Sequence, residues 1–221
     1  MDLKELQQND PLKRIAEKDS GKQGLSPMEP PEAYDLPVKS DIPYEDYHPL
    51  LQKLFDDHKK SKAELKTFED VLEKLRKDGP GSALQGLSDF FRFLDEKILV
   101  HNQNEEKFLF PVLQKRLLEL GDHSNGPAKT TAVDMLEDDH VKLLQVAAVT
   151  FNLIGLASRL PEEKSRIVAL DAGIEQGIAM VEMLRLHVFR EENVVFPKAQ
   201  ECLTISELDQ LKIEFDQSLQ R

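Results

Sequence analysis

The chain of 221 residues carries 29 Lys and Arg side chains against 41 Asp and Glu, a formal net charge of −12. Such a surface repels phosphate backbones and anionic headgroups, so we expect neither nucleic acid nor a membrane as a partner. No apolar run approaches the ~20 residues that span a bilayer and the first residues do not form a secretory signal, so we predict a cytoplasmic protein.

Residues 1–45 are predicted to form a Pro-rich N-terminal extension, distinct from a helical domain at residues 46–221. Prolines crowd the second half of this extension, and large apolar residues are sparse there. Because proline fixes a backbone dihedral and removes a hydrogen-bond donor, we expect extended or loop-like backbone. Over Leu3–Lys18 the apolar residues form only a thin stripe, which favours at most a short helix.

From Pro49 onward, apolar residues recur at three- and four-residue spacings, which is typical of helices. Helical stretches are predicted at about 49–77, 82–110, 112–120, 131–158, 161–196 and 205–219. Asp-Gly-Pro-Gly at 78–81 ends the first stretch, and Pro111 and Pro197 are predicted to interrupt the helices that contain them. Pro161 suits the first position of a helix, and Thr204 begins a capping box. No segment alternates long enough to predict a strand, so the chain is predicted to be all-α.

One string, of the form His-x3-Glu-Glu-x3-Phe-Pro, occurs twice, starting at His101 and again at His187. Residues four apart lie on one face of a helix, so each copy aims an imidazole and a carboxylate in one direction. The carboxylates are those of Glu105 and Glu191. Two such helices facing each other would hold two nitrogen and two oxygen donors around one cavity, which is the outline of a metal site.

Each copy follows an Asp-Asp-His segment, which ends at His58 in the first half of the chain and at His140 in the second. A repeat of this length predicts two helix pairs that pack together, since neither pair can bury its apolar face alone. We therefore predict an up-down four-helix bundle of two pseudo-symmetric pairs, with a short C-terminal helix. Apolar neighbours one turn away, among them Leu54, Leu136 and Leu144, indicate that the histidines point inward.

At these residues the chain resembles the hemerythrin-like, or HHE cation-binding, family over about residues 46–200. The resemblance implies a four-helix bundle that holds a non-haem di-iron centre. It further implies that four histidines ligate the metals and that two glutamates bridge them beside an oxo or hydroxo group: His58, His101, His140 and His187, with Glu105 and Glu191.

Two features separate the chain from the oxygen-carrying members of that family. Those members place a second histidine one turn beyond the third-helix histidine, where this chain has Leu144, and they end with His-x4-Asp, where it has His187 and Glu191. Four histidines and two glutamates are more similar to the branch that repairs iron centres after oxidative or nitrosative stress. Members of that branch often carry an N-terminal domain with reactive cysteines, which we expect this chain to lack, since Cys202 is its single cysteine.

Imidazole and carboxylate donors suit iron or manganese, and zinc is compatible with them as well. A dry bundle lined by Leu and Met would admit a small molecule such as dioxygen, nitric oxide or peroxide and exclude large substrates. Three functions stay open: a redox or gas-reactive centre, with turnover undecided; an iron store, iron donor or sensor module; and a structural metal-binding helical bundle. The sequence identifies no redox partner.

Several repeated residues near these ligands allow two interpretations. Glu106 and Glu192 lie ~140° around the helix from the preceding histidine, which favours a surface position or a supporting role over ligation. Asp57 and Asp139 either orient histidines or lie on solvated faces. The Phe-Pro pair that closes each string is predicted to end or kink a helix.

Overall fold

The computed structural model describes residues 42–79, 81 and 83–218, which belong to one compact unit of the chain. Within these residues every regular element is a helix, so the all-α prediction is confirmed. A single 3₁₀ turn, η1 (Tyr44–Asp46), precedes the first long helix. The short helix predicted over Leu3–Lys18, like most of the predicted extension, lies outside the described residues.

The first long helix, α3 (Pro49–Asp78), has clear signals at both ends. His48 caps its N-terminus, where the Nδ1 atom accepts a hydrogen bond from the N–H of Leu50 at 3.2 Å. Gly79 ends the helix at a φ of 84°, a left-handed conformation that glycine adopts without steric cost. The predicted end of this helix is therefore confirmed.

The second rod of the bundle is continuous and consists of α4 (Leu84–Phe93), η3 (Leu94–Ile98), α5 (Leu99–Asn104), η4 (Glu105–Leu109) and α6 (Phe110–Leu120). η3 and η4 are single π-helical turns, in which an N–H bonds to the carbonyl five residues back. The sequence predicts an interruption at Pro111. Instead the rod continues through it, because the wider turn just before the proline accommodates a residue that donates no hydrogen bond.

The second helix pair consists of α7 (Ala132–Ala157) and a continuous rod of α8 (Glu163–Arg190), η5 (Glu191–Val195) and α9 (Phe196–Cys202). η5 is again a π-helical turn, and Pro197 follows it inside the helix, so the interruption predicted there is also absent. α8 begins two residues after the predicted Pro161. The reason is that Glu162 caps the helix, its carboxylate accepting hydrogen bonds from the N–H groups of residues 164 and 165.

Reciprocal capping boxes start two helices. The predicted box at Thr204 and Glu207 is confirmed, because each side chain accepts a hydrogen bond from the other residue's N–H ahead of α10 (Ile205–Ser218). A second box joins Thr131 and Asp134 at the start of α7. These caps fix where the helices begin and so which residues face inward.

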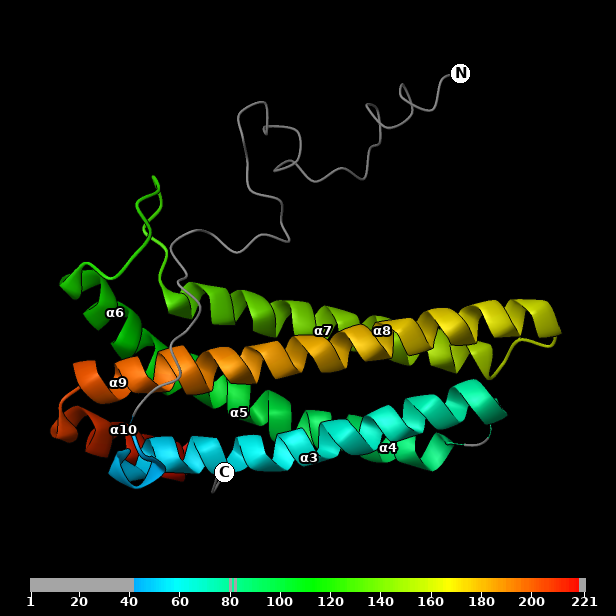
Figure 1. Ribbon diagram of the computed structural model, residues 1–221, viewed down its shortest axis with the longest axis horizontal. Coiled ribbons are helices and arrows are strands. Elements are labelled where there is room, and N and C mark those ends of the chain that lie inside the picture. The colour runs from blue at the N-terminus through cyan, green and yellow to red at the C-terminus, as the bar shows by residue number, and fades with distance from the viewer. Residues whose placement is uncertain (1–41, 80, 82, 219–221) are drawn as a thin grey trace, which may run out of the picture. The chain divides into compact units, whose positions relative to one another are not determined.

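The long helices lie side by side, with α7 along α8 and α8 along α3 (Figure 1). Two apolar clusters fill the interior along the bundle. One contains Leu65 to Leu75 of α3 and the facing parts of α4, α7 and α8, and the other contains Tyr47 to Leu54 with parts of α6, α9 and α10. Between the two clusters lies a polar layer that contains all the predicted ligands; five of them are buried and His101 is half-buried.

Two glycines let α8 approach its neighbours closely. A Cβ atom on Gly173 would lie 2.8 Å from Cγ1 of Ile154 in α7, and one on Gly177 would lie 2.8 Å from Cδ2 of Leu72 in α3. Side chains pack no closer than ordinary van der Waals contact. Alanine at 177 would displace the end of a flexible leucine side chain, whereas alanine at 173 would also lie 3.2 Å from the backbone nitrogen of Ile154. These close contacts lie within the apolar cluster formed by α3, α4, α7 and α8.

One described helix, α7, is long and apolar enough to cross a membrane by length and composition, whereas the sequence is predicted to contain no such run. The core helix of a bundle meets the same criterion. α7 packs along α8 and carries Asp139 and His140 in the interior. We therefore assign α7 to the bundle.

Candidate metal centre

The predicted ligands converge in the polar layer although they come from four different rods. His58 lies on α3 and His140 on α7, while the two His–Glu strings lie at the α5–η4 and α8–η5 junctions. Ligand-type atoms form two groups that lie within 4.8 Å and share both glutamates: His58, His101, Glu105 and Glu191 in one, and Glu105, His140, His187 and Glu191 in the other. Two adjacent metal positions joined by bridging carboxylates have this form.

Within each group the two imidazoles face each other through their Nε2 atoms. The distance is 3.2 Å between His58 and His101, and 3.2 Å between His140 and His187. Two nitrogens bound ~2.1 Å from one metal at a right angle would lie ~3.0 Å apart. Each pair therefore fits ligation of a shared ion.

The carboxylates of Glu105 and Glu191 are fully buried, with 0% of either side chain exposed. None of their four oxygens makes a hydrogen bond of good geometry within the described residues. Glu191 instead lies 3.0 Å from Nε2 of His58 and 3.2 Å from Nε2 of His187. Buried carboxylates are costly unless they are paired or bind a metal, so these residues fit a cation-binding role.

The protonation of this layer without metal follows from burial and mutual charge. Burial raises the pKa of Glu105 well above its usual range, and the charge of Glu191 raises it further. Burial acts on Glu191 as well, but His187 and His58 outweigh it and hold its pKa well below the usual range. The pKa of His187 is raised to about 10, because Glu191 and Asp139 outweigh the lowering effect of burial.

Each predicted bridging glutamate is the first residue of a π-helical turn, Glu105 in η4 and Glu191 in η5. Single π-helical turns occur frequently at functional sites. In an α-helix a residue five positions later lies ~140° around the axis. The wider turn brings that residue, a phenylalanine in both strings, back toward the face of the glutamate.

Phe110 and Phe196 therefore line the centre, whereas the sequence predicts that the Phe-Pro pairs only end or kink helices. Phe110 stacks on the imidazole of His140 with ring centroids 5.7 Å apart, and Phe196 stacks on His58 at 5.3 Å. An apolar wall of this kind limits the access of water to a metal position. The fixed spacing from glutamate to phenylalanine in both strings is the signal that could have revealed this role.

The second glutamate of each string contacts a histidine on another helix. Oε1 of Glu106 lies 2.7 Å from Nδ1 of His140, and Oε1 of Glu192 lies 3.2 Å from Nδ1 of His58. A carboxylate at Nδ1 fixes the tautomer and the ring orientation and leaves Nε2 free to bind a metal. Of the two interpretations that the sequence allows, the contacts favour the supporting role.

The two aspartates of the Asp-Asp-His segments differ from each other. Asp139 lies 3.8 Å from Nδ1 of His187 and is held by Arg190 at 2.6 Å. Asp57 pairs with a lysine of its own helix instead, and Nδ1 of His101 has no hydrogen-bond partner among the described residues. Burial lowers the pKa of His101, and Asp57 opposes this only through its charge.

Leu144 points away from the centre, contrary to the predicted inward stripe, and is 54% exposed. The buried positions of α7 advance by alternating steps of four and three, through Leu136, His140, Leu143 and Ala147. After His140 the next inward position is therefore 143. A histidine at position 144 would face solvent in this bundle.

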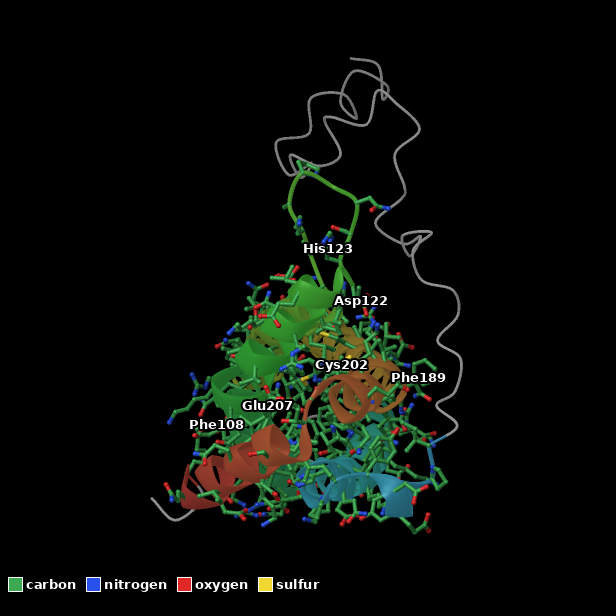
Figure 2. The ribbon with its side chains drawn as sticks, turned by 90° about the vertical axis from the view of Figure 1, so that its left-hand side faces the viewer. Phe108, Asp122, His123, Phe189, Cys202 and Glu207 are labelled. Carbon is green, nitrogen blue, oxygen red and sulfur yellow. The ribbon has the colours of Figure 1, made fainter. Side chains whose placement is uncertain are left out.

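The two other histidines lie away from the centre. His48 caps α3, and its Nε2 atom lies 3.1 Å from Asp209. Figure 2 shows His123 beside Asp122 on the loop that projects beyond the end of α6. The same view places Cys202 at the end of α9, and burial raises the pKa of its thiol, so it is not activated as a nucleophile.

Comparisons with known proteins agree with this geometry. A family model described as the hemerythrin HHE cation-binding domain matches residues 50–199. Over 150 residues the chain is 27% identical to the iron-sulfur cluster repair protein YtfE of Citrobacter koseri, which covers 68% of this chain and 63% of that protein. The protein of the same name from Cronobacter sakazakii is 26% identical over 150 residues, covering 68% of this chain and 62% of its own length.

The chain thus matches less than two thirds of the length of these relatives. No solved structure matches the chain. The similarity to the YtfE proteins is consistent with the ligand pattern of the iron-centre repair branch.

Proposed function

The chain belongs to the hemerythrin HHE cation-binding family, and from this premise we propose that it holds a non-haem di-iron centre that binds or reacts with a small molecule. The proposed molecules are dioxygen, nitric oxide and peroxide. The observation that carries the proposal is the pair of fully buried carboxylates, Glu105 and Glu191, which lie between two imidazole pairs.

Iron is the metal that we propose for this donor set. Each position offers two imidazole nitrogens and a share of two carboxylates, a mixed set that suits iron or manganese, whereas structural zinc sites are closed and four-coordinate. Two iron ions held there would supply redox chemistry and free coordination positions for a small ligand. Manganese and zinc are the alternative metals, which metal analysis separates.

The residues around the ligands have defined roles in this proposal. Glu106 and Glu192 hold the rings of His140 and His58 so that each Nε2 atom faces the metal position. The stacked phenylalanines and the two apolar clusters keep large substrates away from the ligands. In this proposal only a small molecule reaches the centre.

We further propose that the activity serves the cytoplasmic repair of iron centres under oxidative or nitrosative stress, because the similar proteins are named iron-sulfur cluster repair proteins. An iron store or donor, or a sensor module, is the alternative within the same family. The two differ in turnover: an enzyme consumes an excess of nitric oxide or peroxide, whereas a donor or sensor reacts once per centre.

The test uses protein loaded anaerobically with ferrous iron. Its absorbance is recorded before and after addition of dioxygen, nitric oxide or peroxide, and consumption of the added molecule is followed with each in tenfold excess. A spectral change with at least one of the three supports the proposal, and zinc-loaded protein is the control. Full iron occupancy without any spectral response would leave only storage or a structural role.

A further inference from the structure

The two predicted metal positions are supported unequally by the residues around them. At the position of His140 and His187, Nδ1 of His140 lies 2.7 Å from Glu106, and Nδ1 of His187 lies 3.8 Å from Asp139. At the other position only His58 has a carboxylate near its Nδ1 atom. The Nδ1 atoms of His101 and His187 are both buried without a hydrogen-bond partner within the part of the chain that the structure describes, so these two histidines differ in the nearby charge of Asp139.

The cause of this difference lies in the two repeated strings. Arg190, three residues after His187, holds Asp139 toward that histidine with a 2.6 Å ion pair. The equivalent position after His101 is Asn104, whose Oδ1 accepts a hydrogen bond from Ser218 of α10. An asparagine cannot hold a carboxylate by charge.

Asp57, the counterpart of Asp139, is consequently turned toward solvent. Its carboxylate pairs with Lys60 of its own helix at 2.8 Å and is 35% exposed, whereas that of Asp139 is 9% exposed. An exposed pair of this kind is weak. No carboxylate is therefore placed beside Nδ1 of His101 in the way that Arg190 places the charge of Asp139 beside His187.

A cavity of about 330 Å³ opens beside this weaker position. Its walls include Asp57, Lys60, His101, Asn104 and Phe215. The His101 side chain is 10% exposed, whereas that of His187 is 4% exposed. The cavity thus joins the less supported histidine to solvent.

We propose that the two metal positions are inequivalent and that the position between His58 and His101 exchanges its iron first, through this cavity. The proposal rests on the proposed di-iron function and adds to it which iron is exchangeable and which residue sets the difference. Asn104 is a positioning residue here: it leaves Asp57 paired with Lys60 and the cavity open. The position between His140 and His187 retains its metal because Glu106 holds the ring of His140 and Arg190 keeps the charge of Asp139 beside His187.

The experiment measures iron release. Wild-type protein is loaded anaerobically with ferrous iron, its content is verified as two irons per chain, and excess 2,2′-bipyridine is added while the coloured chelate is followed. We expect two phases of equal amplitude whose rates differ by at least ~10-fold, the smallest effect typical of lost support around a metal ligand. Release of both irons in a single phase overturns the proposal.

Reciprocal variants identify the position. Asn104→Arg should slow the fast phase toward the rate of the slow one, because the new guanidinium can draw Asp57 to His101. Arg190→Asn should accelerate the slow phase, and Gln103→Arg, which adds the same charge at a neighbouring exposed position, should change neither. A fast phase unaffected by Asn104→Arg overturns the assignment; if that variant does not fold, the wild-type phases and Arg190→Asn decide.

Failure of the proposed function gives a different result. Wild-type protein that binds fewer than two irons at the loading step contradicts the di-iron proposal, and this one with it. Protein that binds two irons and releases them at one rate contradicts only the inequivalence.

Discussion

The Nδ1 atom of His140 on α7 lies 2.7 Å from Oε1 of Glu106 on η4. A residue next to a predicted bridging ligand thus supports a ligand on a different helix, and Glu192 contacts His58 in the same way. Adjacent residues of a helical turn point in different directions. The Glu-Glu doublet therefore directs one carboxylate at the metal positions and the other at a histidine ring of the neighbouring helix pair.

The two glutamates of one doublet should respond differently to the same substitution. Glu105→Gln removes a bridging carboxylate, so we expect loss of the two-metal centre. Glu106→Gln leaves all ligands in place and removes only the support of His140, which should lower metal affinity roughly 10- to 100-fold while two metals still bind at saturation. Metal analysis and a competitive titration measure both effects. Retention of two metals by Glu105→Gln would refute the bridging role.

Metal binding should strengthen as the pH rises. Without metal, the pKa of His187 is raised to about 10, so His187 carries a proton near neutral pH, and the raised pKa of Glu105 favours its protonated form up to a higher pH than usual. A metal must displace these protons, and affinity should increase roughly tenfold per pH unit for each proton released. Titrations between pH 6 and 8 in buffers of different ionisation enthalpy count the protons. Affinity that is independent of pH over this range contradicts the expectation.

The metal-free protein should show the opposite dependence. The folded pKa of His187 is raised to about 10 and lies above its ordinary value. This group therefore stabilises the fold fully below pH ~6.5, its unfolded pKa. That contribution is lost as the pH rises toward 10. Urea unfolding of the metal-free chain at pH 7 and pH 9.5 measures the change in the free energy of unfolding. A contribution of His187 that increases between these two pH values would contradict the prediction.

Gly173 on α8 and Gly155 on α7 should respond oppositely to alanine. At Gly173 a Cβ atom would meet Cγ1 of Ile154 at 2.8 Å, so Gly173→Ala should destabilise the fold by about 1–3 kcal/mol through overpacking. At Gly155 nothing lies within 4 Å, so Gly155→Ala should stabilise α7 by about 0.5–1 kcal/mol. Urea unfolding compares the two. Equal effects would indicate that the close approach of α8 does not depend on position 173.

A histidine at position 144 should not become a ligand. Leu144 is 54% exposed on the outer face of α7, so Leu144→His should leave metal content and the optical spectrum unchanged. Leu186→His, at another exposed apolar position on α8, controls for an added surface imidazole. An altered spectrum in Leu144→His alone would show that α7 turns inward at this position when metal binds.

Local sequence patterns predict most of the helices because the signals that start and end a helix lie in neighbouring residues. Apolar spacing, the Gly-Pro-Gly break after α3 and the capping box at Thr204 act through neighbouring residues only. The interruptions predicted at Pro111 and Pro197 are wrong for a physical reason. η4 and η5 are π-helical turns, and the extra residue in each allows both prolines to stay inside a continuous helix. Single-residue insertions of this kind leave little trace in apolar periodicity.

The sequence indicates which side chains gather at the candidate site, but not which side chain contacts which histidine ring. Duplication of both histidine segments indicates which residues meet. Which side chain supports which ring depends on the rotation of each helix, and one residue of error in the inward face misplaces Leu144. The contrast between Asp139 and Asp57 depends on the contacts of Arg190 and Lys60, which a repeat pattern does not report.

The most direct test is the iron content of the protein after anaerobic loading with ferrous iron. Metal-free chain is incubated with an excess of ferrous iron, freed of unbound ions, analysed for iron per chain and then exposed to air. We expect two iron atoms per chain, with near-ultraviolet absorbance of an oxo-bridged diferric centre after exposure to air. Fewer than two iron atoms per chain, or two without this absorbance, would contradict the assignment of a di-iron centre.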